Sequence, residues 1–117
     1  MSANTVLIVD DDESITKSFA RILEKNGYNT DVAKTGKEAI QKASNKFYNV
    51  ALIDVFLPDM AGTELLEKLP DNDRMIKIII TGFPTRAKNA DATLEKPVRP
   101  QELLALIKQK IEQKATA

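Results

Sequence analysis

The sequence predicts an α/β domain in which five parallel strands form one doubly wound sheet. Short apolar runs alternate with segments of helical periodicity along the chain. Three of these runs are apolar at almost every position, which is typical of strands buried on both faces of a parallel sheet. The length of 117 residues suffices for one hydrophobic core, so we expect a single domain over residues 1–117.

The first half of the chain is expected to form three strands and two helices. The strands are predicted at Thr5–Val9, Thr30–Ala33 and Val50–Ile53. The first helix should end at Asn26-Gly27, a pair typical of helix C-termini, and the second should begin near Gly36. Both have apolar residues at helical spacing that would face the sheet: Ile15, Phe19, Ile22 and Leu23 in the first, and Ala39, Ile40, Ala43 and Phe47 in the second.

The second half is expected to form two strands and two main helices. A short helix follows the loop Pro58–Gly62 and is stopped by Pro70. Further strands are predicted at Ile76–Ile80 and, more weakly, at Asp91–Leu94. Pro100 suits the first turn of the last helix. The apolar stripes of these helices are Leu65, Leu66 and Leu69, and then Leu103, Leu104, Ile107 and Ile111.

The connection between the last two strands is unusually short. A crossover between parallel strands needs a dozen residues or more, usually with a helix. Between Thr81 and Asp91 there is room for only a turn or so of helix, over Pro84–Lys88. We therefore predict a shortened or irregular fourth helix.

Composition excludes several classes of function. The chain has no histidine and no cysteine, which removes imidazole bases, disulfides and thiolate metal sites. The 17 basic and 17 acidic side chains balance, so direct nucleic-acid binding would need another domain. We expect no membrane segment and, without a basic N-terminal leader, a cytoplasmic location.

Acidic side chains follow two of the predicted strands. Asp10, Asp11 and Asp12 come after the first strand, and Asp54 ends the third. Ligand sites in such sheets lie beyond the carboxyl ends of the strands, where Asp10, Asp11 and Asp54 would converge if the two strands are neighbours. Clustered carboxylates call for a cation, and oxygen ligands suit Mg²⁺. Asp12 lies nearest the first helix, where its charge would favour the N-terminus, so we leave it out of the metal site.

Two further side chains should reach the same edge. Thr81 follows the fourth strand, and Lys96 follows the fifth. A hydroxyl and an ammonium beside a metal-bound carboxylate can hold phosphoryl oxygens. Taken singly, each of these residues has an ordinary explanation as a cap, a strand-end hydroxyl or a solvated lysine. Their joint presence favours a phosphoryl-transfer site.

The chain resembles the receiver domains of two-component response regulators over essentially its whole length. The matching motifs occur in the family's order: Val9-Asp10-Asp11-Asp12, Asp54-Val55-Phe56-Leu57-Pro58 followed by Gly62, Thr81-Gly82, and Lys96-Pro97. Each motif alone is weak, whereas the set is specific. The resemblance implies a flavodoxin-like sheet with strand order 2-1-3-4-5. It also implies a cis bond before Pro97.

The resemblance assigns a role to each site residue. Asp54 would accept the phosphoryl group, and Thr81 and Lys96 would hold its oxygens. Mg²⁺ would be bound by Asp11, by Asp54, by Asp10 largely through water, and by the backbone carbonyl of Phe56. The donor would be a sensor histidine kinase or a phosphotransfer protein, because this chain has no histidine of its own.

The resemblance also implies a mode of signalling. Phosphorylation would change an interaction with a downstream protein whose identity the sequence leaves open. The chain would catalyse its own phosphorylation and slow dephosphorylation without being a turnover enzyme. A homodimer is also left open, with Leu106, off the apolar stripe of the last helix, as a candidate association residue.

Two departures from the family pattern affect this interpretation. Thr93 stands where many receivers have a Tyr or Phe that moves with the threonine, so a tyrosine-based switch is unavailable. Phe56 and Phe83 lie two residues after Asp54 and Thr81. We hypothesise that these bulky rings hinder the attacking water and prolong the phosphorylated state.

Two alternatives come from other functional classes. A degenerate receiver would act as a phosphorylation-independent protein-interaction module, as the short fourth crossover suggests, although the site residues are complete. A haloacid-dehalogenase-like phosphatase also uses a strand-end Asp. It would need a second acid two residues on, where this chain has Phe56.

Overall fold

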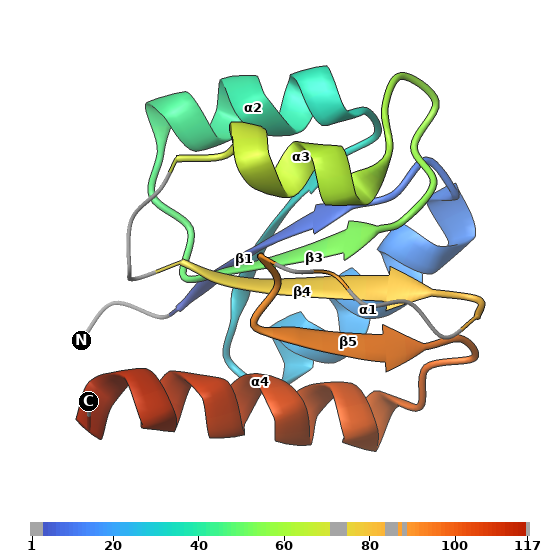
Figure 1. Cartoon of the computed structure of the whole chain (residues 1–117). Helices are drawn as coiled ribbons and strands as arrows, with labels where there is room; N and C mark the ends of the chain where they lie inside the picture. The colour runs from blue at the N-terminus through green and yellow to red at the C-terminus, as the bar shows by residue number, and fades with distance from the viewer. Residues whose placement is uncertain (1–3, 71–74, 84–86, 88, 117) are drawn as a thin grey trace.

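The protein is a three-layered α/β fold around one parallel sheet. The computed structural model describes residues 4–70, 75–83, 87 and 89–116. In the described part, five strands are arranged in the order β2-β1-β3-β4-β5, three helices connect successive strands, and a fourth helix follows β5 (Figure 1). The elements are β1 (Thr5–Val9), α1 (Glu13–Lys25), β2 (Asn29–Ala33), α2 (Gly36–Asn45), β3 (Val50–Asp54), α3 (Gly62–Lys68), β4 (Ile76–Thr81), β5 (Ala92–Glu95) and α4 (Pro100–Thr116). The predicted fold class and strand order are confirmed.

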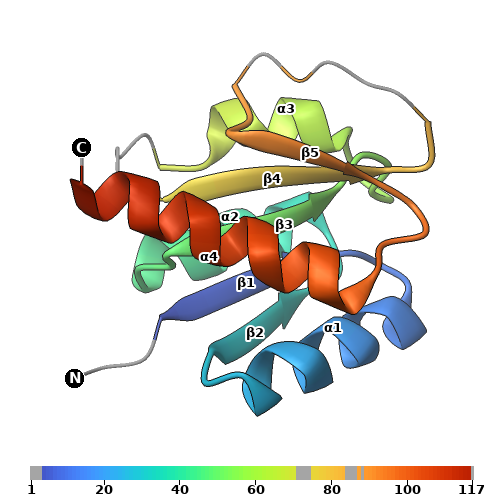
Figure 2. The same cartoon turned by 90° about the horizontal axis from the view of Figure 1, so that it is seen from below.

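Helices cover both faces of the sheet. Helices α2 and α3 pack on one face, and α1 and α4 lie together on the other (Figures 1 and 2). Successive residues of a strand point to opposite faces, so Leu7 and Val9 belong to the core beneath α2 and α3, while Val6 and Ile8 belong to the core beneath α1 and α4. This two-sided burial explains why the central strands are apolar at most positions.

The helices begin where the chain provides acceptors for their first N–H groups. Asp12 caps α1, its carboxylate accepting from the amides of Ser14 at 3.0 Å and Ile15 at 3.4 Å. The Thr35 hydroxyl caps α2 in the same way. Helix α3 follows Ala61, which offers no side-chain acceptor. At the other end of α1, Gly27 has a φ of 90°, the left-handed conformation that terminates helices.

Two predictions about apolar residues are wrong. Phe47 does not belong to the apolar face of α2, because the helix ends at Asn45 and the Phe47 side chain is 46% exposed. The neighbouring Tyr48 is buried instead, and its hydroxyl donates to Asp31 Oδ2 at 2.7 Å. Leu106, expected off the packed face of the last helix, is partly buried against the core beneath α1 and α4.

The prediction of a shortened helix over Pro84–Lys88 falls mainly outside the described residues. Pro84, Thr85, Arg86 and Lys88 are not described, and none of the described residues between β4 and β5 lies in a helix. Strand β5 begins and ends one residue later than predicted. The Lys96-Pro97 bond that follows it is cis. Within the described ranges, no helix is both long enough and apolar enough to cross a bilayer.

Candidate functional site

The register of the sheet brings two acidic strand ends together. Val9 of β1 pairs with Ile53 of β3, so the next residues, Asp10 and Asp54, are neighbours at the carboxyl edge. Strand β4 lies on the other side of β3 and ends at Thr81. Lys96 follows β5 directly, and its amide donates to the Thr81 carbonyl at 2.7 Å. The topology therefore gathers residues from four strands at one edge.

Three carboxylates form the centre of the site. Asp10, Asp11 and Asp54 each offer an oxygen within 4.8 Å of the others. Asp10 is 4% exposed and Asp54 is 8% exposed, whereas Asp11 is open to solvent. Burial raises the pKa of the Asp10 carboxyl, and the nearby charge of Asp54 adds to this, although a hydrogen bond from the Asp12 amide partly opposes it. Asp12 itself faces α1 as its cap, as predicted.

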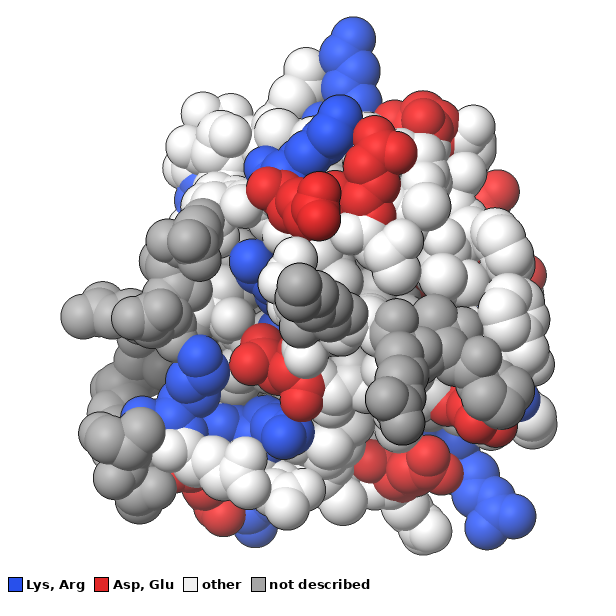
Figure 3. Space-filling view, viewed as in Figure 1, with Lys and Arg blue, Asp and Glu red and all other residues white. Residues whose placement is uncertain are grey.

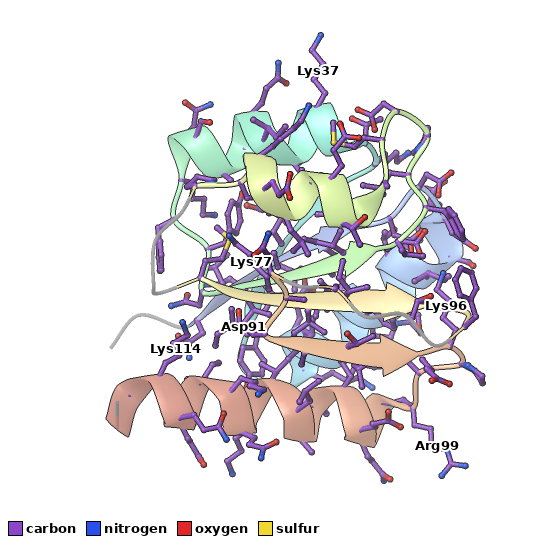
Figure 4. All side chains as sticks on the ribbon, viewed as in Figure 1. Lys37, Lys77, Asp91, Lys96, Arg99 and Lys114 are labelled. Carbon is purple, nitrogen blue, oxygen red and sulfur yellow. The ribbon has the colours of Figure 1, made fainter. Side chains whose placement is uncertain are left out.

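The Lys96 ammonium balances part of this negative charge. Its Nζ atom lies 2.9 Å from Asp54 Oδ1 and 3.9 Å from Asp10 Oδ2, and the side chain is labelled at the carboxyl edge in Figure 4. Burial by itself lowers the pKa of Lys96, but the hydrogen bond and charge of Asp54 outweigh it, so the pKa is raised. Lys96 is therefore a cation at neutral pH, directly beside the Asp54 carboxylate.

Thr81 is fully buried and its hydroxyl is engaged with the loop after β4. The Oγ1 atom donates to the Phe83 carbonyl at 2.9 Å and accepts from the Phe83 amide at 3.3 Å. A hydroxyl has one proton to donate. To donate to a group on Asp54, Thr81 would have to release the Phe83 carbonyl.

The two phenylalanines predicted to flank the site are in contact with each other. Phe56 is 65% exposed and Phe83 is 49% exposed, and their ring centroids are 5.7 Å apart at a tilt of 50°. The rings therefore connect the loop after β3 with the loop after β4. The structure therefore places two exposed, contacting aromatic rings on the loops that follow Asp54 and Thr81.

The donor set fits a hard divalent cation. Two or three carboxylate oxygens within a few Å are the ligands that Mg²⁺ prefers, with water completing its coordination. The structure does not test the further ligand expected from the sequence, the backbone carbonyl of Phe56, which belongs to the loop that follows Asp54. The arrangement can therefore hold a cation beside a carboxylate nucleophile and an ammonium, the combination that phosphoryl transfer uses.

A family model, the response regulator receiver domain, matches residues 6–108. The chain belongs to this family. Receivers are signalling modules rather than classical enzymes, and they act with histidine kinases or phosphotransfer proteins.

Solved and curated relatives support the assignment. The receiver resembles a CheY-like response regulator receiver domain protein from Methanospirillum hungatei JF-1, with 42% identity, a TM-score of 0.91 and 98% of each chain covered. It is 31% identical to the alkaline phosphatase synthesis transcriptional regulatory protein PhoP of Bacillus subtilis and 32% identical to the CpxR homolog of Haemophilus influenzae. Each match covers 88% of this chain. The chain spans about half the length of these curated relatives, 46% and 48%.

Sequence reasoning missed the hydrogen bonds of one side chain in the loop next to the site. Asp59, in the loop after β3, accepts hydrogen bonds from the amides of Gly36 and Lys37 at the start of α2. Pro58 and Asp59 have the composition of a turn, which predicts a loop but not its partner. The partner lies more than 20 residues away in sequence, so only the tertiary structure identifies it.

Proposed function

We propose that this receiver accepts a phosphoryl group on Asp54 from a partner histidine kinase or phosphotransfer protein, with Mg²⁺, and signals through a phosphorylation-dependent protein interaction. One observation carries the proposal. The Asp54 carboxylate lies in a three-acid cluster with the Lys96 ammonium 2.9 Å from its Oδ1 atom. A buried acid held this way is a nucleophile with charge compensation already in place.

The transfer step is a displacement at phosphorus. An Asp54 carboxylate oxygen attacks the phosphorus of a phosphohistidine, a P–O bond forms, and the P–N bond breaks. The electron pair of that bond returns to the imidazole nitrogen of the donor, which takes up a proton from solvent. The chain itself contains no histidine, so the donor is a separate protein or a small phosphodonor.

The surrounding residues would stabilise the product. Lys96 already lies beside Asp54 Oδ1 and would pair with the oxygens of the new phosphoryl group. Thr81 would exchange its bond to the Phe83 carbonyl for one to a phosphoryl oxygen. Asp10, Asp11, Asp54 and the Phe56 carbonyl would hold Mg²⁺, which when bound offsets charge on the transferring group.

Intact mass spectrometry tests the proposal directly. Wild type treated with acetyl phosphate and Mg²⁺ should gain the mass of one phosphoryl group, and hydroxylamine should remove it, as it does from acyl phosphates. Asp54→Ala should gain nothing. Glu95→Gln removes another acid at this edge of the sheet, at the exposed end of β5, and should leave the gain unchanged.

Other outcomes would assign a different function. Absence of added phosphate on wild type, with unchanged partner binding, would favour a phosphorylation-independent interaction module. Sustained release of phosphate from small esters would favour a phosphatase. Phosphate on Asp54→Ala would show that another side chain is the acceptor.

A further inference from the structure

The loop between β3 and α3, residues 55–61, is fastened to the start of α2. Asp59 Oδ1 accepts from the Gly36 amide at 2.8 Å, and Oδ2 accepts from the Lys37 amide at 2.9 Å. The loop rises beside the first turn of α2 in Figure 1, and Lys37 is labelled at that turn in Figure 4. Both oxygens of one carboxylate are thus committed to a helix that belongs to another part of the sequence.

The contact is chemically favourable. The first N–H groups of a helix lack partners within it, and the helix dipole attracts negative charge there. Thr35 caps α2 locally by accepting from the Glu38 amide at 3.0 Å. The amides of Gly36 and Lys37 remain, and Asp59 satisfies both. These hydrogen bonds lower the pKa of Asp59, the one from Gly36 most strongly, so the carboxylate is charged at neutral pH.

A close apolar contact reinforces the hydrogen bonds. Met60 packs on Gly36 so tightly that a Cβ atom there would lie 2.5 Å from the Met60 sulfur. A larger residue at position 36 would displace the Met60 side chain from this position. Met60 is also partly buried against the core beneath α2 and α3, so the tip of the loop has both a polar and an apolar anchor.

The other end of the loop is fastened to the acceptor strand. The Gly62 amide donates to the Val55 carbonyl at 2.7 Å, and the Leu57 amide donates to the Met60 carbonyl at 3.2 Å. A Cβ at Gly62 would lie 2.3 Å from the Asp54 carbonyl oxygen, so the base of the loop touches the acceptor backbone itself. Phe56 lies between these two anchored ends and forms a bridge with Ala61.

We infer that Asp59 is a positioning residue: by tying the loop to α2, it sets the Phe56 backbone carbonyl at the magnesium site. The inference rests on the proposed function, since it concerns the same site. Asp59 touches neither the phosphoryl group nor the cation. Without the Asp59 carboxylate, the loop tip would lose its hydrogen bonds to α2, and the Phe56 carbonyl would occupy a wider range of positions.

Two substitutions separate this role from ordinary helix capping. Asp59→Ala removes the hydrogen bonds that join the loop to α2. Thr35→Ala removes a cap from the same helix but leaves the hydrogen bonds between the loop and α2 in place. Both should destabilise α2. Only Asp59→Ala should weaken Mg²⁺ binding, measured by isothermal titration calorimetry, by roughly tenfold, the effect typical of residues that orient metal ligands.

Phosphorylation kinetics give a second readout. In Asp59→Ala, the Mg²⁺ concentration needed for half-maximal phosphorylation by acetyl phosphate should rise by the same factor. The phosphorylation rate at saturating Mg²⁺ should change by a smaller factor than this concentration does. Asp59→Asn keeps one acceptor oxygen, so its Mg²⁺ concentration for half-maximal phosphorylation should lie between those of wild type and Asp59→Ala.

The outcomes distinguish this inference from the proposed function. If wild type binds Mg²⁺ and is phosphorylated, and Asp59→Ala behaves as wild type does, only the positioning role is overturned. It is also overturned if Thr35→Ala weakens Mg²⁺ binding as much as Asp59→Ala, because the effect would then belong to α2 stability. If wild type neither binds Mg²⁺ nor becomes phosphorylated, the proposed function fails, and the inference fails with it.

Discussion

At the scale of single residues, the three acids of the cluster have different surroundings. Asp10 and Asp54 are nearly buried, whereas Asp11 is exposed. Lys96 contacts both buried acids and lies closer to Asp54, so the proposed phosphoryl acceptor is the acid with the nearer cation. The exposed acid can be neutralised without disturbing the core, which makes Asp11 a suitable position for testing the metal site.

The contact between Phe56 and Phe83 leads to a prediction about the lifetime of the phosphorylated state. The rings belong to the loops that follow β3 and β4, and we expect them to hinder an attacking water at Asp54. Phe56→Asn and Phe83→Ala should each speed hydrolysis of the acyl phosphate by roughly tenfold, equivalent to about 1.4 kcal/mol of barrier. The loss of phosphorylated protein, followed by intact mass after removal of the donor, measures this rate.

Phe47 provides the control for this experiment. It is 46% exposed, similar to Phe83, but it precedes β3 and so lies at the opposite edge of the sheet. Phe47→Ala should leave the hydrolysis rate unchanged. Equal rates in wild type, Phe56→Asn and Phe83→Ala would refute the shielding role.

At the scale of elements, the helices differ in how they begin. Helices α1 and α2 have side-chain caps from Asp12 and Thr35, and α2 gains two more acceptor oxygens from Asp59. Helix α3 has seven residues and starts after Ala61, without a side-chain cap. Among α1, α2 and α3, the helix start without a side-chain cap is therefore the one next to the loop that carries Phe56.

This difference predicts a stabilising substitution. Ala61 is exposed and has the extended backbone of an N-cap residue, with φ −72° and ψ 145°. Ala61→Ser should place a hydroxyl acceptor at the start of α3 and raise the free energy of unfolding by about 1 kcal/mol, measured by urea denaturation. Ala105→Ser, at an exposed position inside α4, should be neutral or slightly destabilising. A loss of stability in Ala61→Ser would show that this turn cannot accommodate a cap.

The hydrogen bond from Tyr48, which follows α2, to Asp31 of β2 predicts that the free energy of unfolding depends on pH. Burial raises the pKa of the Tyr48 hydroxyl, and its hydrogen bond to Asp31 raises it further. Above about pH 10 the tyrosine ionises in the unfolded chain but keeps its proton in the folded one, so stability falls as pH rises, by up to about 1.4 kcal/mol per pH unit.

Tyr48→Phe isolates this effect. The variant should be less stable than wild type at pH 8, by about 1 kcal/mol for the lost hydrogen bond, and the gap should narrow above pH 10. Urea denaturation of both proteins at several pH values measures the gap. A stability difference between wild type and Tyr48→Phe that stays constant with pH would contradict the prediction, because Tyr48 would then titrate in the same way in the folded and unfolded states.

At the scale of the whole molecule, the charge is balanced but locally uneven. Acidic and basic side chains intermingle on the face shown in Figure 3, with no broad patch of one sign among the described residues there. The strand-end cluster is different, because it brings three carboxylates within 4.8 Å of one another. Repulsion among these carboxylates therefore destabilises the folded state relative to the unfolded chain, in which the three acids are not held together.

This cost predicts that Mg²⁺ stabilises the fold. A cation that binds only the folded protein should raise the free energy of unfolding by about 2.7 kcal/mol at a concentration 100 times its dissociation constant. Thermal denaturation with Mg²⁺ and with excess EDTA measures the difference. Asp11→Asn should lose most of the Mg²⁺ effect while folding normally, since Asp11 is exposed. The same Mg²⁺ effect in both proteins would place the cation elsewhere.

Local patterns in the sequence predicted the five strands, the four described helices and the acids at the strand ends, and the family resemblance supplied the strand order. Continuous apolar runs predict buried strands, and parallel strands bring their carboxyl ends together, so Asp10, Asp54, Thr81 and Lys96 could be placed at one edge from strand boundaries alone. Only the tertiary structure decided which neighbouring side chain fills the core after α2, Tyr48 rather than Phe47. It also decided that the Thr81 hydroxyl bonds the Phe83 carbonyl and that Asp59 holds α2. These contacts depend on how loops distant in sequence dock in space, which no local periodicity specifies.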